Sequence, residues 1–141
     1  MTLRIGEAAE RSGVTPRTIR YYEELGLLPR GERAYGKHRL YSQADIDRLQ
    51  ELTRLRDLLG LTLEELRSMI VAEDARADVR RRFHASESPQ EQLALLDEAL
   101  PHIEMQLDLV RRRIAQLQEL ERELVEKRRS VGRRRRELGA R

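Results

Sequence analysis

The stretch that decides the fold of this chain spans residues 13–23 and reads Gly-Val-Thr-Pro-Arg-Thr-Ile-Arg-Tyr-Tyr-Glu. Gly13 suits the left-handed residue that ends a helix, and Thr15 followed by Pro16 suits the N-cap and first position of the next helix. That second helix should stop at Gly26. Two helices of about two turns each, joined by a tight turn, outline a helix-turn-helix.

The next elements follow from turn and capping signals. Residues 27–41 combine Leu-Leu-Pro, two glycines and an alternating run at 39–41, which together predict a small hairpin. Ser42 and Thr62 each precede an acidic residue three positions on, and such capping boxes predict two further helices. Residues 73–88 are the least readable stretch, and we expect a short basic helix and a linker there.

The C-terminal half carries a heptad pattern over residues 89–126. Eight consecutive seam positions up to Leu117 are apolar, which predicts a coiled coil that fades where Glu121 and Arg128 take seam positions. Pro101 should kink this helix or mark its start, because proline lacks the backbone N–H. The residues expected to form a dimer are Ile103, Leu107, Val110, Ile114, Leu117 and Leu124.

Composition narrows the class of protein. Aromatic residues make up 4% and charged residues 38% of 141 residues, so one compact domain with a long solvated helix is expected. The sequence has no cysteine, which excludes disulfides, thiolate metal sites and thiol redox switches. No apolar run of about 18 residues and no signal peptide are present, so we expect a cytoplasmic protein without a membrane partner.

Charge is segregated along the chain. Residues 1–42 carry eight Lys/Arg against five Asp/Glu, residues 43–126 carry twelve against nineteen, and residues 127–141 carry eight against one. Basic ends indicate a polyanionic partner, although arginine runs are also typical of solvated surface. Four successive arginines at 133–136 repel one another and Gly132 weakens a helix, so the free tail is expected to be mobile.

Four segments together resemble the N-terminal domain of the MerR family. They are residues 5–9 (Ile-Gly-Glu-Ala-Ala), 13–23 as quoted above, 26–28 (Gly-Leu-Leu) and 39–42 (Arg-Leu-Tyr-Ser), within a match over roughly residues 3–72. The resemblance implies a mainly all-α fold: a winged helix-turn-helix with a small β wing, followed by a long antiparallel coiled-coil dimerisation helix. It also implies promoter binding with distortion of the DNA.

The expected organisation therefore has four parts. Residues 1–72 form the winged helix-turn-helix DNA-binding domain, 73–88 a linker or short helix, 89–126 the coiled-coil dimerisation helix, and 127–141 a basic tail. In an antiparallel coiled coil, the end of one helix lies beside the DNA-binding domain of the other subunit. The tail is then either solvated or within reach of the DNA backbone.

The residues expected to contact DNA lie on the second helix and the wing. A recognition helix presents its N-terminal side chains to the major groove, where arginine binds guanine O6 and N7 or a phosphate. Ile19 is expected in the core, while Tyr22 fits either the core or the DNA. Residues 33–38 form a wing tip that departs from the family's shorter one. The resemblance implies contacts by Arg17, Thr18, Arg20, Tyr21, Arg39 and Tyr41, and Lys37 in the wing tip is a further candidate contact.

Catalysis and metal binding find no support in the sequence. The three histidines are scattered without a carboxylate or cysteine at ligand spacing, and no nucleophile–histidine–carboxylate set or phosphate-binding glycine loop occurs. We expect neither an enzyme nor a bound cofactor or metal. Metal sensors of the family that bind soft metals depend on cysteine, so an effector here would be a small molecule.

Three functions compete at this point. The first is a ligand-responsive regulator, whose ligand would lodge around Phe83 and His84; the second is a regulator without an effector. The third is a coiled-coil scaffold, against which the motif at 13–23 argues. For the regulators we expect a homodimer on a pseudo-palindromic site in double-stranded promoter or operator DNA, with RNA polymerase as a partner and a nucleoid-associated location. Activation and repression both remain open.

Overall fold

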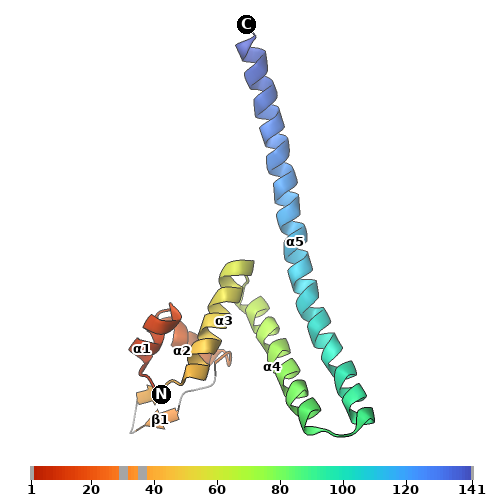
Figure 1. Cartoon of the computed structure of the whole chain (residues 1–141). Coiled ribbons are helices and arrows are strands. Elements are labelled where there is room, and N and C mark those ends of the chain that lie inside the picture. Colours follow the sequence, from red (N-terminus) through yellow and green to blue (C-terminus); the bar gives the residue numbers. More distant parts are fainter. Residues whose placement is uncertain (1, 29–31, 35–37, 141) are drawn as a thin grey trace. The chain divides into compact units, whose positions relative to one another are not determined.

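The computed structural model describes residues 2–28, 32–34 and 38–140 (Figure 1). The chain divides into two compact units, residues 1–103 and residues 104–141. In chain order the elements are α1 (Ile5–Ser12), α2 (Pro16–Glu24), β1 (Glu32–Ala34), β2 (His38–Leu40), α3 (Gln43–Leu59), α4 (Leu63–Ala85) and α5 (Pro89–Gly139).

The two N-terminal helices form the expected helix-turn-helix. Gly13 ends α1 with φ 77°, a left-handed conformation that glycine adopts without steric cost. Its N–H donates to the carbonyl of Ala9 at 3.0 Å, which satisfies a carbonyl at the helix end. Thr15 caps α2, because its hydroxyl oxygen accepts the backbone N–H of Thr18 at 3.1 Å. α1 packs against both α2 and α3.

The wing is a two-stranded antiparallel sheet in which Glu32 pairs with Leu40. An isolated bridge extends its base, since Leu3 and Tyr41 exchange backbone hydrogen bonds of 2.8 and 2.7 Å. The N-terminal segment is therefore tied to the chain that leaves the wing. The fold is mainly helical with a small β wing, as the sequence predicts.

The core lies where α1, α2, α3 and the start of α4 meet. Both predicted capping boxes are present, at Ser42 with Asp45 and at Thr62 with Glu65, so α3 and α4 begin where the sequence places them. The largest side chains with less than 2% of their surface exposed are Ile19, Tyr22, Leu27, Leu28, Tyr41, Ile46, Leu49, Leu52, Leu66 and Ile70.

α4 is longer than expected. It runs as one helix through most of residues 73–88, and only residues 86–88 join it to α5, so the expected linker is reduced to three residues (Figure 1). The reason is that oppositely charged side chains three residues apart support a helix even where no apolar stripe is readable. The pairs in this stretch are Glu73–Arg76 and Asp78–Arg81.

α4 and the first part of α5 form a helical hairpin. Arg82 Nη2 lies 2.7 Å from Glu98 Oε1, and this ion pair joins the faces on which Val79 and Leu95 are buried. α5 begins well before Pro101, which lies inside the helix, so this proline does not mark its start. Unlike a proline at the first position of a helix, Pro101 leaves one interior backbone hydrogen bond unmade.

Within the unit of residues 104–141, α5 continues to Gly139. The basic tail that was expected to be mobile is therefore helical in this structure. Successive residues of a helix lie about 100° apart, so among residues 133–136 only the first and last are neighbours on the helix surface. In the described part of the chain, every helix is too short or too polar to traverse a lipid bilayer.

Candidate DNA-binding surface

The second helix of the helix-turn-helix has two distinct faces. Ile19 and Tyr22 are fully buried and fix α2 to the core. Arg17, Arg20 and Tyr21 lie on the opposite face and are exposed, Tyr21 at 43%. Tyr22 is thus a core residue, and its hydroxyl oxygen accepts a hydrogen bond from an α3 arginine. The exposed face presents arginine donors at the N-terminal half of a helix, where recognition helices meet base edges.

Thr18, the remaining predicted contact on α2, is half-buried. Its hydroxyl lies 2.9 Å from the hydroxyl of Thr15, and its backbone N–H donates to the same atom. A hydroxyl has one donor and two acceptor positions, so Thr18 can take part in the cap and still meet a phosphate.

The wing is joined to α2 by a buried carboxylate that the sequence reasoning missed. The Glu23 side chain is only 1% exposed, and its Oε2 accepts a hydrogen bond from Arg39 Nη1 at 2.6 Å. Its Oε1 accepts a second one from the Tyr41 hydroxyl at 2.8 Å. A buried carboxylate needs such partners, because an unpaired one is strongly destabilised away from water. Glu23 therefore holds the last residues of the wing against the recognition helix.

This environment changes the acidity of Tyr41. Burial raises the pKa of its hydroxyl above the ordinary value, and the hydrogen bond to Glu23 raises it further. Both act in the same direction, since burial disfavours the charged phenolate and a neighbouring carboxylate repels it. The hydroxyl therefore stays protonated and continues to donate to Glu23 at neutral pH.

Two of the three predicted wing contacts need revision or lie outside the described residues. Tyr41 is fully buried and bonded to Glu23, so its predicted contact with DNA is replaced by a role in holding the wing. Lys37 lies outside the described residues. Arg39 keeps 28% of its side chain exposed and commits Nη1 to Glu23, while a guanidinium carries five N–H donors in all. It can therefore hold Glu23 and a phosphate together.

An arginine of α3 braces the chain just after the recognition helix. Arg48 Nε donates to the carbonyl of Leu27 at 3.0 Å, and its two terminal nitrogens bind the carboxylate of Asp74 at 2.7 and 2.8 Å. A second α3 arginine, Arg56, donates to the Tyr22 hydroxyl at 3.2 Å. These bonds hold α2 and the residues that follow it against α3. The sequence offered no local signal for them, because the paired residues are 21 to 34 positions apart.

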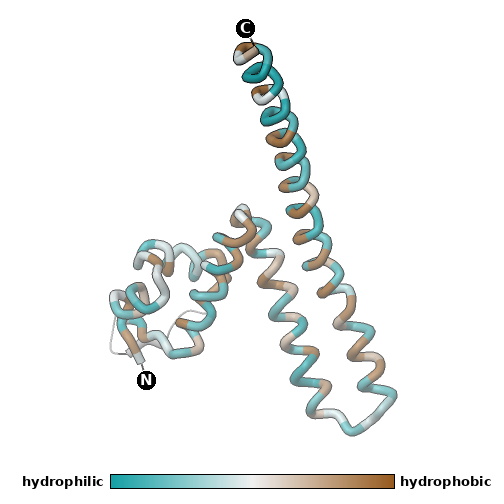
Figure 2. The backbone as a smooth tube through the Cα atoms, turned by 45° about the horizontal axis from the view of Figure 1, so that its top comes forward, coloured by the Kyte–Doolittle hydropathy of each residue, from teal (hydrophilic) through white to brown (hydrophobic). Residues whose placement is uncertain are grey.

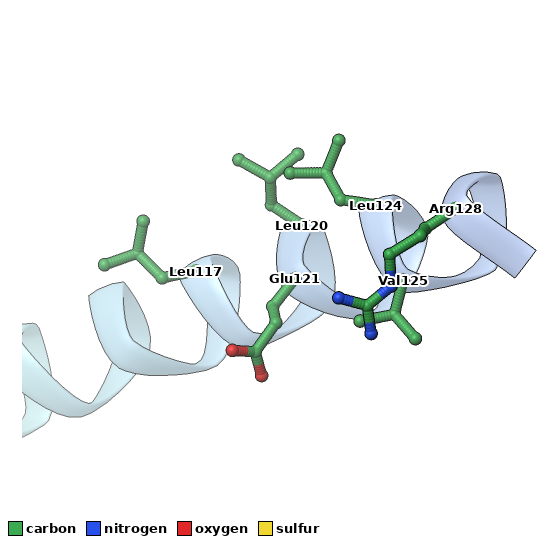
Figure 3. Close-up of a pocket in the computed structure, with 6 residues that line it drawn as sticks. All are labelled: Leu117, Leu120, Glu121, Leu124, Val125 and Arg128. Atoms are coloured by element: carbon green, nitrogen blue, oxygen red, sulfur yellow. The ribbon is translucent and has the colours of Figure 1, made fainter.

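The predicted dimer residues lie along α5. Ile103, Leu107 and Val110 are half-buried, while Ile114, Leu117 and Leu124 are about half exposed. Figure 3 shows that Leu117, Leu120 and Leu124 point to one side of the helix and Glu121 and Val125 to the other. Together with Arg128 these residues line a shallow concavity. The heptad pattern assigned a seam position to Glu121 and left Leu120 out. In the structure it is Leu120 that continues the apolar stripe at this point.

The proposed ligand position and metal sites can be placed as well. Phe83 is half-buried and His84 exposed in the last turn of α4, and their rings meet edge to face with centroids 5.7 Å apart. Within residues 2–28, 32–34 and 38–140, no three His, Cys, Asp or Glu side chains gather in a way that could hold a metal ion.

A helix-turn-helix with an exposed basic face, braced against a two-stranded wing, defines a winged helix-turn-helix DNA-binding protein. Residues 3–73 match the family model described as MerR HTH family regulatory protein. The HTH-type transcriptional regulator YfmP of Bacillus subtilis (strain 168) is 34% identical over 116 residues, which are 82% of this chain and 83% of that protein. The chain belongs to the MerR family of DNA-binding transcriptional regulators, and it is a regulator rather than an enzyme.

Other proteins are similar to this chain as well. The Mercuric resistance operon regulatory protein of Bacillus cereus is 47% identical over 70 residues, half of this chain and 52% of that protein. Among solved structures, the regulator PbrR691 from Ralstonia metallidurans CH34 in complex with lead(II) is 32% identical with a TM-score of 0.47, covering 90% of this chain and 85% of that one. HiNmlR bound to promoter DNA is 23% identical with a TM-score of 0.46, covering 82% and 80%.

Proposed function

We propose that this regulator binds a pseudo-palindromic promoter site as a homodimer, with α2 of each subunit in successive major grooves, and distorts the DNA on binding. The observation that carries the proposal is the outward face of α2. Arg17, Arg20 and Tyr21 are exposed there, while Ile19 and Tyr22 are buried and hold the helix in place. A fixed helix with free donors is what base recognition requires, since base contacts depend on position.

The side chains take different roles in this proposal. At least one of Arg17 and Arg20 reads a base pair by donating two hydrogen bonds to guanine, which is the commonest specific contact of arginine. Tyr21 and Thr18 offer hydroxyls to phosphate oxygens. Arg39 binds a phosphate from the wing while Glu23 fixes its position. Phosphate contacts set the register of the protein on the duplex, and base contacts supply the preference for sequence.

The dimer is proposed to form through α5 in antiparallel orientation. An apolar stripe with about half of each side chain exposed loses water-accessible surface when a second copy packs on it, which is favourable. From Ile103 to Leu124 the helix is about 33 Å long at roughly 1.5 Å per residue. That length is close to the spacing of about 34–36 Å between successive major grooves, which two recognition helices must match.

For the effector, we propose a small molecule rather than a thiolate-bound metal. The mercuric and lead-bound relatives carry metals in their names, but these 141 residues contain no cysteine, so no thiolate of this chain can coordinate one. RNA polymerase is the proposed partner at the promoter, since the family regulates transcription.

Selection of bound fragments from random duplex DNA tests the proposal. The expected product is a two-fold symmetric consensus whose half-sites lie about one helical turn apart. Replacing Arg17 and Arg20 together by Ala should erase or change the consensus. Arg122→Ala is the matched control, because Arg122 is an exposed arginine of α5 that pairs with Glu119 and lies opposite the apolar stripe. An asymmetric consensus, or one that the double variant retains, would contradict the proposal.

A further inference from the structure

We propose that the C-terminal end of α5 is a second DNA-binding surface, which binds the phosphate backbone of duplex DNA without reading its sequence. The surface consists of Arg133–Arg136, here called the arginine cluster. The inference rests on the proposed function, because it adds a contact to a protein that binds DNA. It assigns to the tail a role separate from the recognition helix and from the dimer stripe.

The charge of this segment is uncompensated. Residues 127–141 contain eight Lys/Arg and a single acidic residue, Glu137. The four side chains of the arginine cluster are exposed, and within the described residues no carboxylate forms an ion pair with any of them. The ion pair nearest in sequence joins Arg129 to Glu126 at 3.8 Å. Figure 2 shows the resulting hydrophilic colouring toward the C-terminal end of α5.

Stabilisation of the helix end does not account for this charge. A helix carries a partial negative charge at its C-terminus, which favours cations, but the effect is confined to the last turn. Only Arg136 lies in the last turn of α5. The other three arginines, and Lys127 to Arg129 before them, stand where the helix end gives them no such benefit.

The arrangement also differs from that of a packed helix face. Successive residues are about 100° apart around a helix, so the four guanidinium groups point in all directions from α5. A stripe that packs against another helix would occupy one side only. Whichever side of α5 is covered, basic side chains remain exposed on the others. A surface that is basic all round suits a ligand held by charge rather than by shape.

Phosphate is the ligand that this chemistry favours. Guanidinium groups bind phosphate oxygens through two parallel hydrogen bonds, and they lose less hydration than an ammonium when they do so. The Arg136 guanidinium lies beside Gly132, since a Cβ at this position would meet Arg136 Nη1 at 3.6 Å, an ordinary van der Waals contact. Like charges at positions 133 and 136 repel on the free helix, and a phosphate between them relieves that repulsion. Duplex DNA carries one negative charge per about 1.7 Å of its axis, which is close to the rise of about 1.5 Å per residue that separates the four successive arginines along α5.

The test uses the full-length protein with all four cluster arginines replaced by Gln, which keeps the helix and removes the charge. Affinity for the selected operator and for a scrambled duplex is measured between about 50 and 200 mM salt. We expect weaker binding to both duplexes with an unchanged ratio between them. The slope of log affinity against log salt should fall by about two per dimer, so that affinity drops about sixteen-fold less over this range than in the wild type.

Two controls make the result specific. Replacing the four arginines by Lys keeps the charge and should restore most of the slope. Replacing four exposed arginines elsewhere by Gln changes the net charge equally and should leave the slope near the wild-type value; these are Arg80, Arg111, Arg112 and Arg122. Sedimentation and circular dichroism verify that every variant is a helical dimer.

Two outcomes would overturn the inference: an unchanged slope in the Gln variant, or an equal loss of slope in the net-charge control. A wild-type protein that binds no duplex at all would instead overturn the proposed function, so the two failures are distinguishable.

Discussion

Glu23→Gln is the perturbation that tests most sharply how the wing is held. The wild-type carboxylate is buried and accepts one hydrogen bond from the Arg39 guanidinium at 2.6 Å and one from the Tyr41 hydroxyl at 2.8 Å. The glutamine side chain would still accept from Tyr41 through its carbonyl oxygen, but it has no charge to offer the arginine. The variant therefore removes the ion pair with Arg39 and leaves a neutral hydrogen bond in place of the one that Tyr41 donates to the carboxylate.

The magnitude follows from the exposure of the two partners. Breaking a fully buried ion pair destabilises a protein by about 3–5 kcal/mol, and a hydrogen bond to a charged group contributes about 1.5–3 kcal/mol. Arg39 keeps 28% of its side chain exposed and can turn toward water when its partner is lost. We therefore expect a loss of about 2 kcal/mol, between these limits and nearer the lower one. With a urea dependence of about 2 kcal/mol per molar, the unfolding midpoint falls by about 1 M.

Urea unfolding at a fixed protein concentration measures this loss, and Glu24→Gln is the matched control. Glu24 is the exposed neighbour on the same helix and its replacement removes the same charge, so stability should change by less than about 0.5 kcal/mol. On DNA, Glu23→Gln should weaken operator and scrambled duplex alike, because the wing meets phosphate. If the two variants unfold at the same midpoint, Glu23 does not hold the wing.

Three further predictions concern the dimer, the buried tyrosine and metals. Replacing Leu107 and Ile114 together by Asp should give monomers that lose operator binding. An intact dimer in sedimentation would contradict the assignment of these α5 residues to the dimer interface. Because the pKa of Tyr41 is raised, the folded chain keeps a proton that the unfolded chain loses above pH about 10, so the free energy of unfolding should fall by up to about 1.4 kcal/mol per pH unit there. Tyr41→Phe should remove that part of the slope and Tyr21→Phe should not; equal slopes in both variants would contradict it. Purified protein should carry no stoichiometric zinc, copper, mercury or iron, and elemental analysis finding about one tightly bound metal per subunit would overturn this.

Local features of the fold could be predicted from the sequence because their causes are local. Gly13 ends a helix through its own backbone freedom, and the caps at Thr15, Ser42 and Thr62 each use a side chain within three residues. The wing was predictable from its glycines and alternation. The family resemblance added the overall order of these elements, and the structure has that order.

The features that the sequence did not predict depend on contacts between residues far apart in the chain. Glu23 could have been suspected, since it shares the buried face of Ile19 and Tyr22, but its partners lie 16 and 18 residues away and no spacing rule names them. Tyr41 has the residue type of a phosphate contact, and only its burial reveals the other role. A short helix was expected within residues 73–88, but its continuity with α4 was not. Its support comes from charged pairs, which sequence patterns also associate with loops.

Binding titrations with Arg17→Ala, Arg20→Ala and Arg39→Ala decide whether α2 is the helix that reads DNA. Each variant is measured on operator and scrambled duplex at several salt concentrations. For at least one of Arg17 and Arg20, we expect a loss of about 1–3 kcal/mol on the operator and a relaxed preference at one base pair. For Arg39 we expect an equal loss on both duplexes and a salt slope lower by about one per subunit. Uniform losses for all three arginines would contradict the assignment of base reading to α2.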